Sequence, residues 1–377
     1  MMQQQRAVSL RDESVDPRGA MSRPVRAFAE MLNDRARDVR GKIVAIYALL
    51  AALQIAAWGA ALIAFSTRPP LLGTALLAYG FGLRHAVDAD HISAIDNVTR
   101  KLMQEGKRPV AVGLCFSLGH STIVVLLSVV IAIAASLVRD RLPELQSTGG
   151  IIGTAISAAF LLVIATINLL VFFEIARVFA RARKGERPSE DSADVLPGQG
   201  GLFAGLFRPL LRVAGGSWQM YPIGLLFGLG FDTATEVGLL GIAAVEAGKG
   251  LPVIDILIFP LLFTAGMSLV DTTDGILMIG AYGWAFVKPM RKLYYNMVIT
   301  LVSVLVALVV GGLEALGLVA AQAHLQGPLW SAIVNLNDNF STLGFVIVGI
   351  FVVSWGISSL IYRWRRYDEL DAYRASP

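Results

Sequence analysis

Long runs of apolar residues, separated by short polar stretches, dominate the chain. Eight runs can be drawn, and each is close to the roughly 20 residues that a membrane-spanning helix needs. The longest polar stretch lies between the fourth and the fifth run. The pattern predicts an all-α integral membrane protein with eight transmembrane helices, over residues 43–65, 71–98, 109–138, 151–176, 220–247, 253–283, 294–321 and 340–362.

The composition supports this prediction and excludes other classes. Hydrophobic residues make up 55% of the 377 residues and charged residues only 16%, whereas soluble domains carry about 25% charged residues. A cytosolic enzyme of this length could not bury so much apolar surface. The single cysteine, Cys115, excludes an intrachain disulfide and a thiolate metal cluster.

The distribution of basic residues predicts how the chain crosses the membrane. With the N-terminus placed in the cytoplasm, 27 of the 32 Lys and Arg residues fall in inside segments and four in outside loops. Such a bias sets topology, so the net charge of +4 does not indicate nucleic-acid binding. We expect a multi-pass protein of the cytoplasmic membrane with both termini in the cytoplasm. Its parts are a tail over 1–42, helices 1–4 within 43–180, a polar loop over 181–219, helices 5–8 within 220–362, and a tail over 363–377.

Two pairs of segments resemble each other within the chain. Phe81-Gly82-Leu83 in the second run matches Phe227-Gly228-Leu229 in the fifth, and Ser117 to Thr122 in the third run matches Ser268 to Thr273 in the sixth. The copies lie three spans apart, so they cross the membrane in opposite directions. Inverted repeats are typical of secondary transporters, and the pattern predicts that helices 2–4 repeat as helices 5–7. The alternative is chance similarity between helices rich in Gly, Ser and Leu.

The second run carries a concentration of ionisable residues. His85, Asp88 and His91 fall within about 120° of one another on a helix, and Asp90 points elsewhere, where it could orient a ligand or pair with Arg84. Ionised groups in hydrocarbon are costly, so they indicate a functional site. Imidazole with carboxylate favours ions such as Ni, Co, Zn and Fe over Mg or Ca. The alternative is a salt-bridge network that only fixes helix packing.

Three further runs contribute polar residues at membrane depth. His120 lies near the middle of the third run, where a transport site is expected. Asp232 and Glu236 share one helix face in the fifth run, and Asp271 and Asp274 share one in the sixth. These carboxylates could complete a coordination sphere, relay protons or pair with Arg84. We interpret Asp96, Asn97, Glu314 and His324 as ordinary polar residues, most of them near water.

At these residues the sequence resembles the nickel/cobalt transporter (NiCoT) family. Arg84 to Ile92 resembles the family signature His-x4-Asp-His, and three further stretches resemble its other blocks. They are Leu118 to Thr122, Leu229 to Glu236 and Gly266 to Asp274. Thr122 stands where serine is commoner in the family.

The resemblance implies a permease that takes up nickel or cobalt ions, with the metal as substrate and no bound cofactor. Its partners would be the ion and membrane lipids. The metal-handling residues that it suggests are His85, Asp88, Asp90, His91, His120, Asp232, Glu236, Asp271 and Asp274. Arg84, Thr122, Thr233 and Thr272 are expected to support these ligands.

Three other functions remain open at this point. The first is an exporter of the same ions, because inverted-repeat carriers can run in either direction. The second is a membrane metalloenzyme, although the His-Glu-x-x-His zinc signature is absent from the sequence. The third is a channel, although conduction requires weaker binding than a cluster of buried carboxylates would give.

Overall fold

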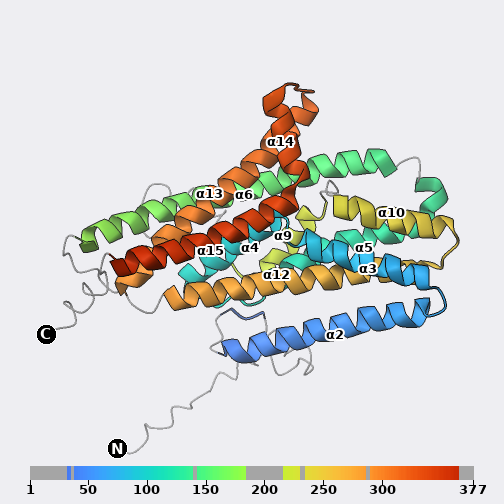
Figure 1. Cartoon of the computed structure of the whole chain (residues 1–377), viewed down its shortest axis with the longest axis horizontal. Coiled ribbons are helices and arrows are strands. Elements are labelled where there is room, and N and C mark those ends of the chain that lie inside the picture. The colour runs from blue at the N-terminus through green and yellow to red at the C-terminus, as the bar shows by residue number, and fades with distance from the viewer. Residues whose placement is uncertain are drawn as a thin grey trace, which may run out of the picture.

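A computed structural model describes most of the chain and shows a bundle of helices (Figure 1). The described residues are 32–34, 38–138, 142–183, 215–229, 234–285 and 289–364. Within these ranges every regular element is a helix, which confirms the all-α class. Most of the predicted tails 1–42 and 363–377 and most of the loop 181–219 lie outside the described residues.

The helices follow the predicted apolar runs, with ends that differ by up to nine residues. Three of the runs are interrupted, and α14 lies outside all of them. In chain order the helices are α2 (Val39–Phe65), α3 (Pro69–His85), α4 (Ala89–Gln104), α5 (Val112–Val138), α6 (Leu142–Arg183), the short 3-10 helix η2 (Ser217–Gln219), α9 (Met220–Phe227), α10 (Ala234–Gly248), α11 (Val253–Ile256), α12 (Ile258–Ala285), α13 (Pro289–Gln322), α14 (Pro328–Asp338) and α15 (Phe340–Trp364).

Five of these helices are long and apolar enough to cross a membrane on their own. They cover residues 39–65, 112–133, 150–181, 253–281 and 293–322. A sixth span results if α14 and α15, which meet at an angle of 80°, are counted together. Figure 1 shows α14 projecting sideways from the bundle, beside the end of α13.

The predicted second and fifth spans are each divided into two helices. The run 71–98 is built of α3 and α4, and the run 220–247 is built of α9 and α10. Neither pair contains one continuous helix of membrane length. Hydropathy averaged over a run does not show where the helix within it ends. Broken helices at membrane depth occur where the freed backbone groups line a binding site or are buried in protein.

The local sequence explains the break between α3 and α4. Asp88 adopts an extended conformation (φ −65°, ψ 146°) at the N-terminal cap of α4. The amides of Val87 and Asp88 instead donate to the carbonyls of Arg84 and His85, at 3.1 and 2.9 Å, which closes α3 with a tight turn. The Asp88 carboxylate makes no capping hydrogen bond in α4 and turns to His85. The break therefore places these two side chains next to each other.

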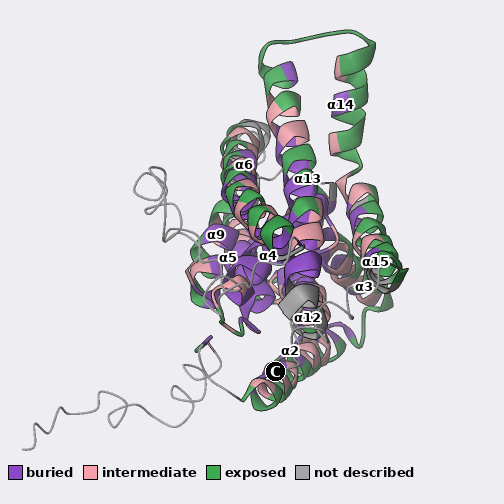
Figure 2. Ribbon diagram, turned by 90° about the vertical axis from the view of Figure 1, so that its left-hand side faces the viewer, coloured by how far each residue is buried: buried purple, intermediate pink, exposed green. Residues whose placement is uncertain are grey.

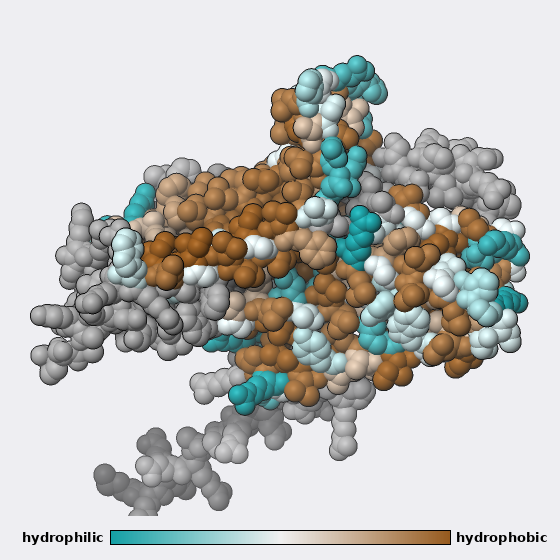
Figure 3. Space-filling model, in the orientation of Figure 1, coloured by the Kyte–Doolittle hydropathy of each residue, from teal (hydrophilic) through white to brown (hydrophobic). Residues whose placement is uncertain are grey.

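The outer surface of the bundle is apolar, as expected for a protein surrounded by lipid. Ile63 on α2 is 82% exposed and Ile133 on α5 is 71% exposed. Figure 3 shows a hydrophobic surface along α13 and α15 on the face turned to the viewer. Large exposed apolar areas of this kind mark membrane contact.

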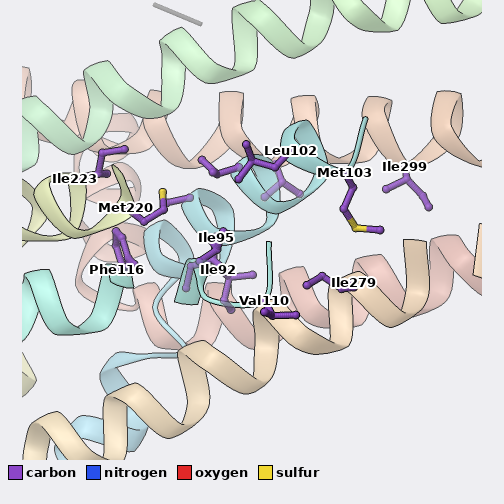
Figure 4. Close-up of a cluster of buried hydrophobic side chains, with 14 of the residues drawn as sticks. Ile92, Ile95, Leu102, Met103, Val110, Phe116, Met220, Ile223, Ile279 and Ile299 are labelled. Atoms are coloured by element: carbon purple, nitrogen blue, oxygen red, sulfur yellow. The ribbon is translucent and has the colours of Figure 1, made fainter. Parts of the chain in front are cut away.

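Buried residues concentrate on α4, α5 and α12, at the centre of the bundle (Figure 2). One apolar cluster surrounds α4, and Figure 4 shows Ile92 and Ile95 of that helix near Phe116 and Met220. A second cluster joins α2, α3, α10 and α12. His85, Asp88 and His91 of the second run are buried at the centre of the bundle as well.

Glycines allow the central helices to approach closely. A Cβ at Gly82 of α3 would collide with the carbonyl oxygen of Phe263 on α12, and one at Gly224 of α9 would collide with that of Phe116 on α5. Gly344 of α15 meets the carbonyl of Val87 in the same way, at the break between α3 and α4. Small residues at such crossings let helix backbones pack tightly in membranes, which brings side chains from several helices into one site.

Candidate metal centre

Three helix ends and the middle parts of two helices bring the polar side chains together. His85 is the last residue of α3, and His91 lies in the first turn of α4. His120 lies within α5, Asp271 lies within α12, and Glu236 is in the first turn of α10. The breaks in the second and fifth runs therefore direct two helix N-termini and one C-terminus at a common centre.

Three imidazoles form the centre of the site. A ligand nitrogen from each of His85, His91 and His120 lies within 4.8 Å of the others. The ring centroids are 4.6 to 4.9 Å apart. All three side chains are buried, with exposures of 2% or less. The side chains predicted to act together in the second and third runs do meet in the fold.

Carboxylates surround the imidazoles on two sides. Asp88 Oδ2 lies 2.9 Å from His85 Nδ1, and both oxygens of Asp271 lie 3.3 Å from His91 Nδ1. Glu236 Oε1 lies 2.8 Å from His120 Nε2 and 3.8 Å from His85 Nε2. The carboxylates of Asp88 and Asp271 thus occupy the Nδ1 side of two rings, and Glu236 lies on the Nε2 side.

The Nε2 atoms are the nitrogens directed at the centre. His85 Nε2 and His120 Nε2 are 3.0 Å apart, and His91 Nε2 has no hydrogen-bond partner among the described residues. Two nitrogens that bind one transition ion at about 2.0–2.1 Å each are separated by about 2.9–3.4 Å for angles between square and tetrahedral. The separation therefore fits two ligands of one ion.

Aromatic rings and helix backbones enclose this centre. Phe116 meets the His91 ring edge to face at a centroid distance of 4.8 Å, and Phe263 lies 5.6 Å from the His85 ring. A buried site of this kind strengthens electrostatic attraction between a cation and the surrounding carboxylates. Thr235, which the sequence did not single out, adds a hydroxyl 3.3 Å from His85 Nδ1.

The other predicted residues lie around this centre or outside the described part. Asp90 interacts electrostatically with His85 and Asp271, and Asp274 interacts with Asp271. Thr272 is fully buried beside Asp271. Arg84 is exposed, and Thr122 bonds Tyr221 of α9 at 2.9 Å. Asp232 and Thr233 lie outside the described residues.

The structure corrects two sequence interpretations. His85, Asp88 and His91 do not share the face of one helix, because α3 ends at His85 and α4 begins after Asp88. They converge because the turn folds the chain back between two half-helices. Asp96 and Asn97, expected near water, are fully buried among α4, α6 and α13. Polar residues near the end of a predicted span were therefore wrongly read as solvated.

The bundle and its buried cluster define an integral membrane protein with a nitrogen- and oxygen-rich centre enclosed by helices. Comparison with known proteins then shows to which family of this class the chain belongs. Residues 71–361 match the family model for NicO, described as a high-affinity nickel-transport protein. The chain belongs to this nickel/cobalt transporter family, and its relatives are transporters rather than enzymes.

The similarity to characterised relatives covers most of the chain. The chain is 58% identical over 330 residues to the high-affinity nickel transport protein of Cupriavidus necator, and the match covers 88% of this chain and 94% of that protein. It is 48% identical to the nickel transporter NicT of Mycobacterium tuberculosis, over 79% and 80% of the two chains. It is 39% identical to the cobalt transport protein NhlF of Rhodococcus rhodochrous, over 85% and 90%. No solved structure matches the chain significantly.

Proposed function

We propose that this protein takes up Ni²⁺ or Co²⁺ across the cytoplasmic membrane by alternating access, through the site formed by the three histidines. The observation that carries the proposal is the convergence of His85, His91 and His120 in a buried centre with carboxylates on both sides. Relatives named as nickel and cobalt transporters support the choice of ion.

The geometry favours a definite division of roles among these residues. A metal-binding histidine usually donates its second ring N–H to a carboxylate, which fixes the ring and raises its basicity. Asp88 and Asp271 have this relation to Nδ1 of His85 and His91. We therefore assign Nε2 of the three histidines and the Glu236 carboxylate as direct ligands. Asp88 and Asp271 orient the rings instead of binding the ion.

The remaining carboxylates contribute charge. Asp90 and Asp274 lie close enough to Asp271 to interact with it electrostatically. Burying an ion costs several kcal/mol. Several carboxylates around one centre offset this cost for a dication. Asp232 is proposed to add to this charge on the basis of its sequence position. The mixed nitrogen and oxygen donor set suits Ni²⁺ and Co²⁺ better than Mg²⁺ or Ca²⁺.

We further propose eight spans with both termini in the cytoplasm. In this topology α3 with α4, and α9 with α10, each cross the membrane as a broken span, in addition to the six candidate spans. Half-helices that meet at a binding site are a known solution in transporters. The strong inside bias of Lys and Arg supports the orientation, and lipid is proposed to cover the apolar outer surface.

Contacts between the two predicted repeats support a two-fold relation. Ser117 and Ser268 occupy equivalent positions in the repeats, and their hydroxyls are hydrogen-bonded at 3.0 Å. His120 is equivalent to Asp271 in the same alignment, and each faces a partner from the neighbouring broken span. His120 pairs with Glu236, and Asp271 pairs with His91. A transport site at the meeting of inverted repeats is expected.

The direction of transport decides between uptake and the rival proposal of export. Cells that express the chain are expected to accumulate more ⁶³Ni²⁺ than control cells and to become more sensitive to nickel. The measurement is cell metal content across Ni, Co, Zn, Fe and Mn, with a His91→Gln variant at equal protein level as control. Lower nickel content together with greater resistance would show that the protein exports the ion.

A further inference from the structure

The helices divide into two groups by their packing. In the first, which we call the α12 group, α12 packs on α2, α3 and α5, and α5 packs on α9 and α10. In the second, the α13 group, α13 packs on α4, α6, α14 and α15, and α15 also packs on α4. The main contact between the groups joins α4 to α12. The break at residues 86–88 separates α3 of one group from α4 of the other.

Polar contacts hold α4 in the α13 group. Arg100 is only 1% exposed, and its guanidinium donates to Ser303 Oγ at 3.1 Å and to Thr300 Oγ1 at 3.2 Å, both on α13. It also donates to Asn97 Oδ1 at 3.0 Å, and the same oxygen accepts from Asn168 of α6 at 2.7 Å. We call these residues, with Asp96, the Arg100 cluster: Asp96, Asn97, Arg100, Asn168, Thr300 and Ser303.

Arg100 and His91 lie on opposite faces of α4. Nine residues separate them, which is two and a half turns of an α-helix. His91 faces Asp271 of α12 and Phe116 of α5, whereas Arg100 faces α13. The helix thus joins the metal centre on one side to the α13 group on the other. Hydrogen bonds from a charged donor are about twice as strong as neutral ones in a buried setting.

The candidate ligands are divided between the groups in the same way. His85, His120 and Glu236 belong to α3, α5 and α10, all in the α12 group. His91 belongs to α4 and therefore to the α13 group. A relative movement of the groups would remove one imidazole from the other ligands and leave the remaining ones in place.

We propose that the α13 group moves as a body against the α12 group when the ion is released, with residues 86–88 as the hinge and Arg100 as the positioning residue that makes His91 travel with the α13 group. This proposal rests on the transport function proposed above. Losing one imidazole lowers the affinity for the ion. Within the α13 group the hydrogen bonds of Arg100 to α13 resist separation. Between the groups, Ile95 of α4 packs beside Gly275 of α12, and the contact of His91 with Asp271 would break in the movement.

A disulfide between the groups tests the movement. A Cβ at Gly275 of α12 would lie 4.0 Å from Thr99 Oγ1 of α4, the atom that the sulfur of a cysteine at position 99 would replace, so cysteines at these two positions would face each other. Thr99→Cys with Gly275→Cys, in a Cys115→Ala background without other cysteines, can be oxidised by diamide, which takes up the two electrons and two protons. We expect nickel uptake in vesicles to fall at least about tenfold, nickel binding to persist, and reduction by dithiothreitol to restore uptake.

A disulfide within the α13 group is the matched control. A Cβ at Gly317 of α13 would lie 3.1 Å from Asn337 Cγ of α14, so Gly317→Cys with Asn337→Cys can be oxidised in the same background. Uptake is expected to be unchanged. Normal uptake through the oxidised Thr99–Gly275 pair would overturn the proposal, as would equal inhibition by both disulfides. Each protein is compared with its own reduced form, and both influx and efflux of nickel are measured. A transport direction opposite to the proposed one would therefore be distinguished from a failure of the proposed movement.

The positioning role of Arg100 is tested by removing its acceptors on α13. Thr300→Val with Ser303→Ala is expected to lower the maximal uptake rate about tenfold, the effect of losing hydrogen bonds to a charged group. The Kd for Ni²⁺ should not change, because neither residue contacts the histidines. Thr300→Ser retains the acceptor and should retain the rate. A parallel loss of rate and affinity, or no loss of rate, would contradict the role.

Discussion

Replacement of His91 by glutamine is expected to abolish high-affinity nickel binding and, with it, uptake. The change removes the Nε2 atom that faces the other two imidazoles and has no hydrogen-bond partner in the described part of the chain. The glutamine amide can still donate to Asp271, so the neighbouring carboxylate keeps a partner. We expect the Kd for Ni²⁺ to rise by more than about 100-fold, beyond the loss caused by removing a residue that only orients a ligand.

The measurement is nickel binding to purified protein, together with ⁶³Ni²⁺ uptake in cells. His324→Gln is the matched control, because His324 is an exposed histidine in the turn between α13 and α14 and touches none of the site residues. It should bind and transport normally. The midpoint of thermal unfolding without nickel shows whether His91→Gln remains folded. Binding of nickel by folded His91→Gln with an unchanged Kd would refute the role of His91.

Asp88→Asn is expected to weaken nickel binding about 10- to 100-fold without abolishing it. The asparagine retains a polar group 2.9 Å from His85 Nδ1 but loses the charge that fixes the ring and raises its basicity. Asp271→Asn should act in the same way on His91. Glu236→Leu, by contrast, removes the proposed ligand oxygen and should cause the larger loss expected for the histidines.

X-ray absorption spectroscopy on the nickel-loaded proteins separates these roles. The number of nitrogen and oxygen ligands at the metal should be the same for Asp88→Asn and the unchanged protein, while the affinity differs. The Glu236→Leu protein, loaded at a concentration above its weakened Kd, should show an altered ligand shell. A changed shell in Asp88→Asn would mean that Asp88 binds the ion directly, and our assignment would then be wrong.

The apolar pattern was sufficient to predict the long helices but not their breaks. Hydropathy does not register a change in backbone direction, so the runs 71–98 and 220–247 were each predicted as one span, although α4 carries polar as well as apolar residues. The break at 86–88 depends on Asp88, whose carboxylate bonds His85 instead of capping α4. The conformation of Asp88 therefore depends on a side-chain contact that exists only in the folded protein.

The sequence predicted which residues belong to the candidate site, but only the structure shows which of them contact each other. The sequence indicated His120 and Glu236 separately, and only the packing of α5 against α10 shows that they are 2.8 Å apart. The Arg100 cluster was missed because charged residues near a span end are usually solvated. Here α6, α12 and α13 cover that end of α4, and Arg100 donates to three neutral oxygens.

The pairing of His120 with Glu236 and of His91 with Asp271 has a consequence for biosynthesis. The paired residues are separated by 116 and 180 positions, so a ribosome completes each histidine long before its carboxylate. Before the second half of the chain has been synthesised, His91 and His120 lack these acidic partners. We therefore expect a nascent or prematurely terminated polypeptide to bind nickel more weakly than the complete protein, because the proposed Glu236 ligand is missing.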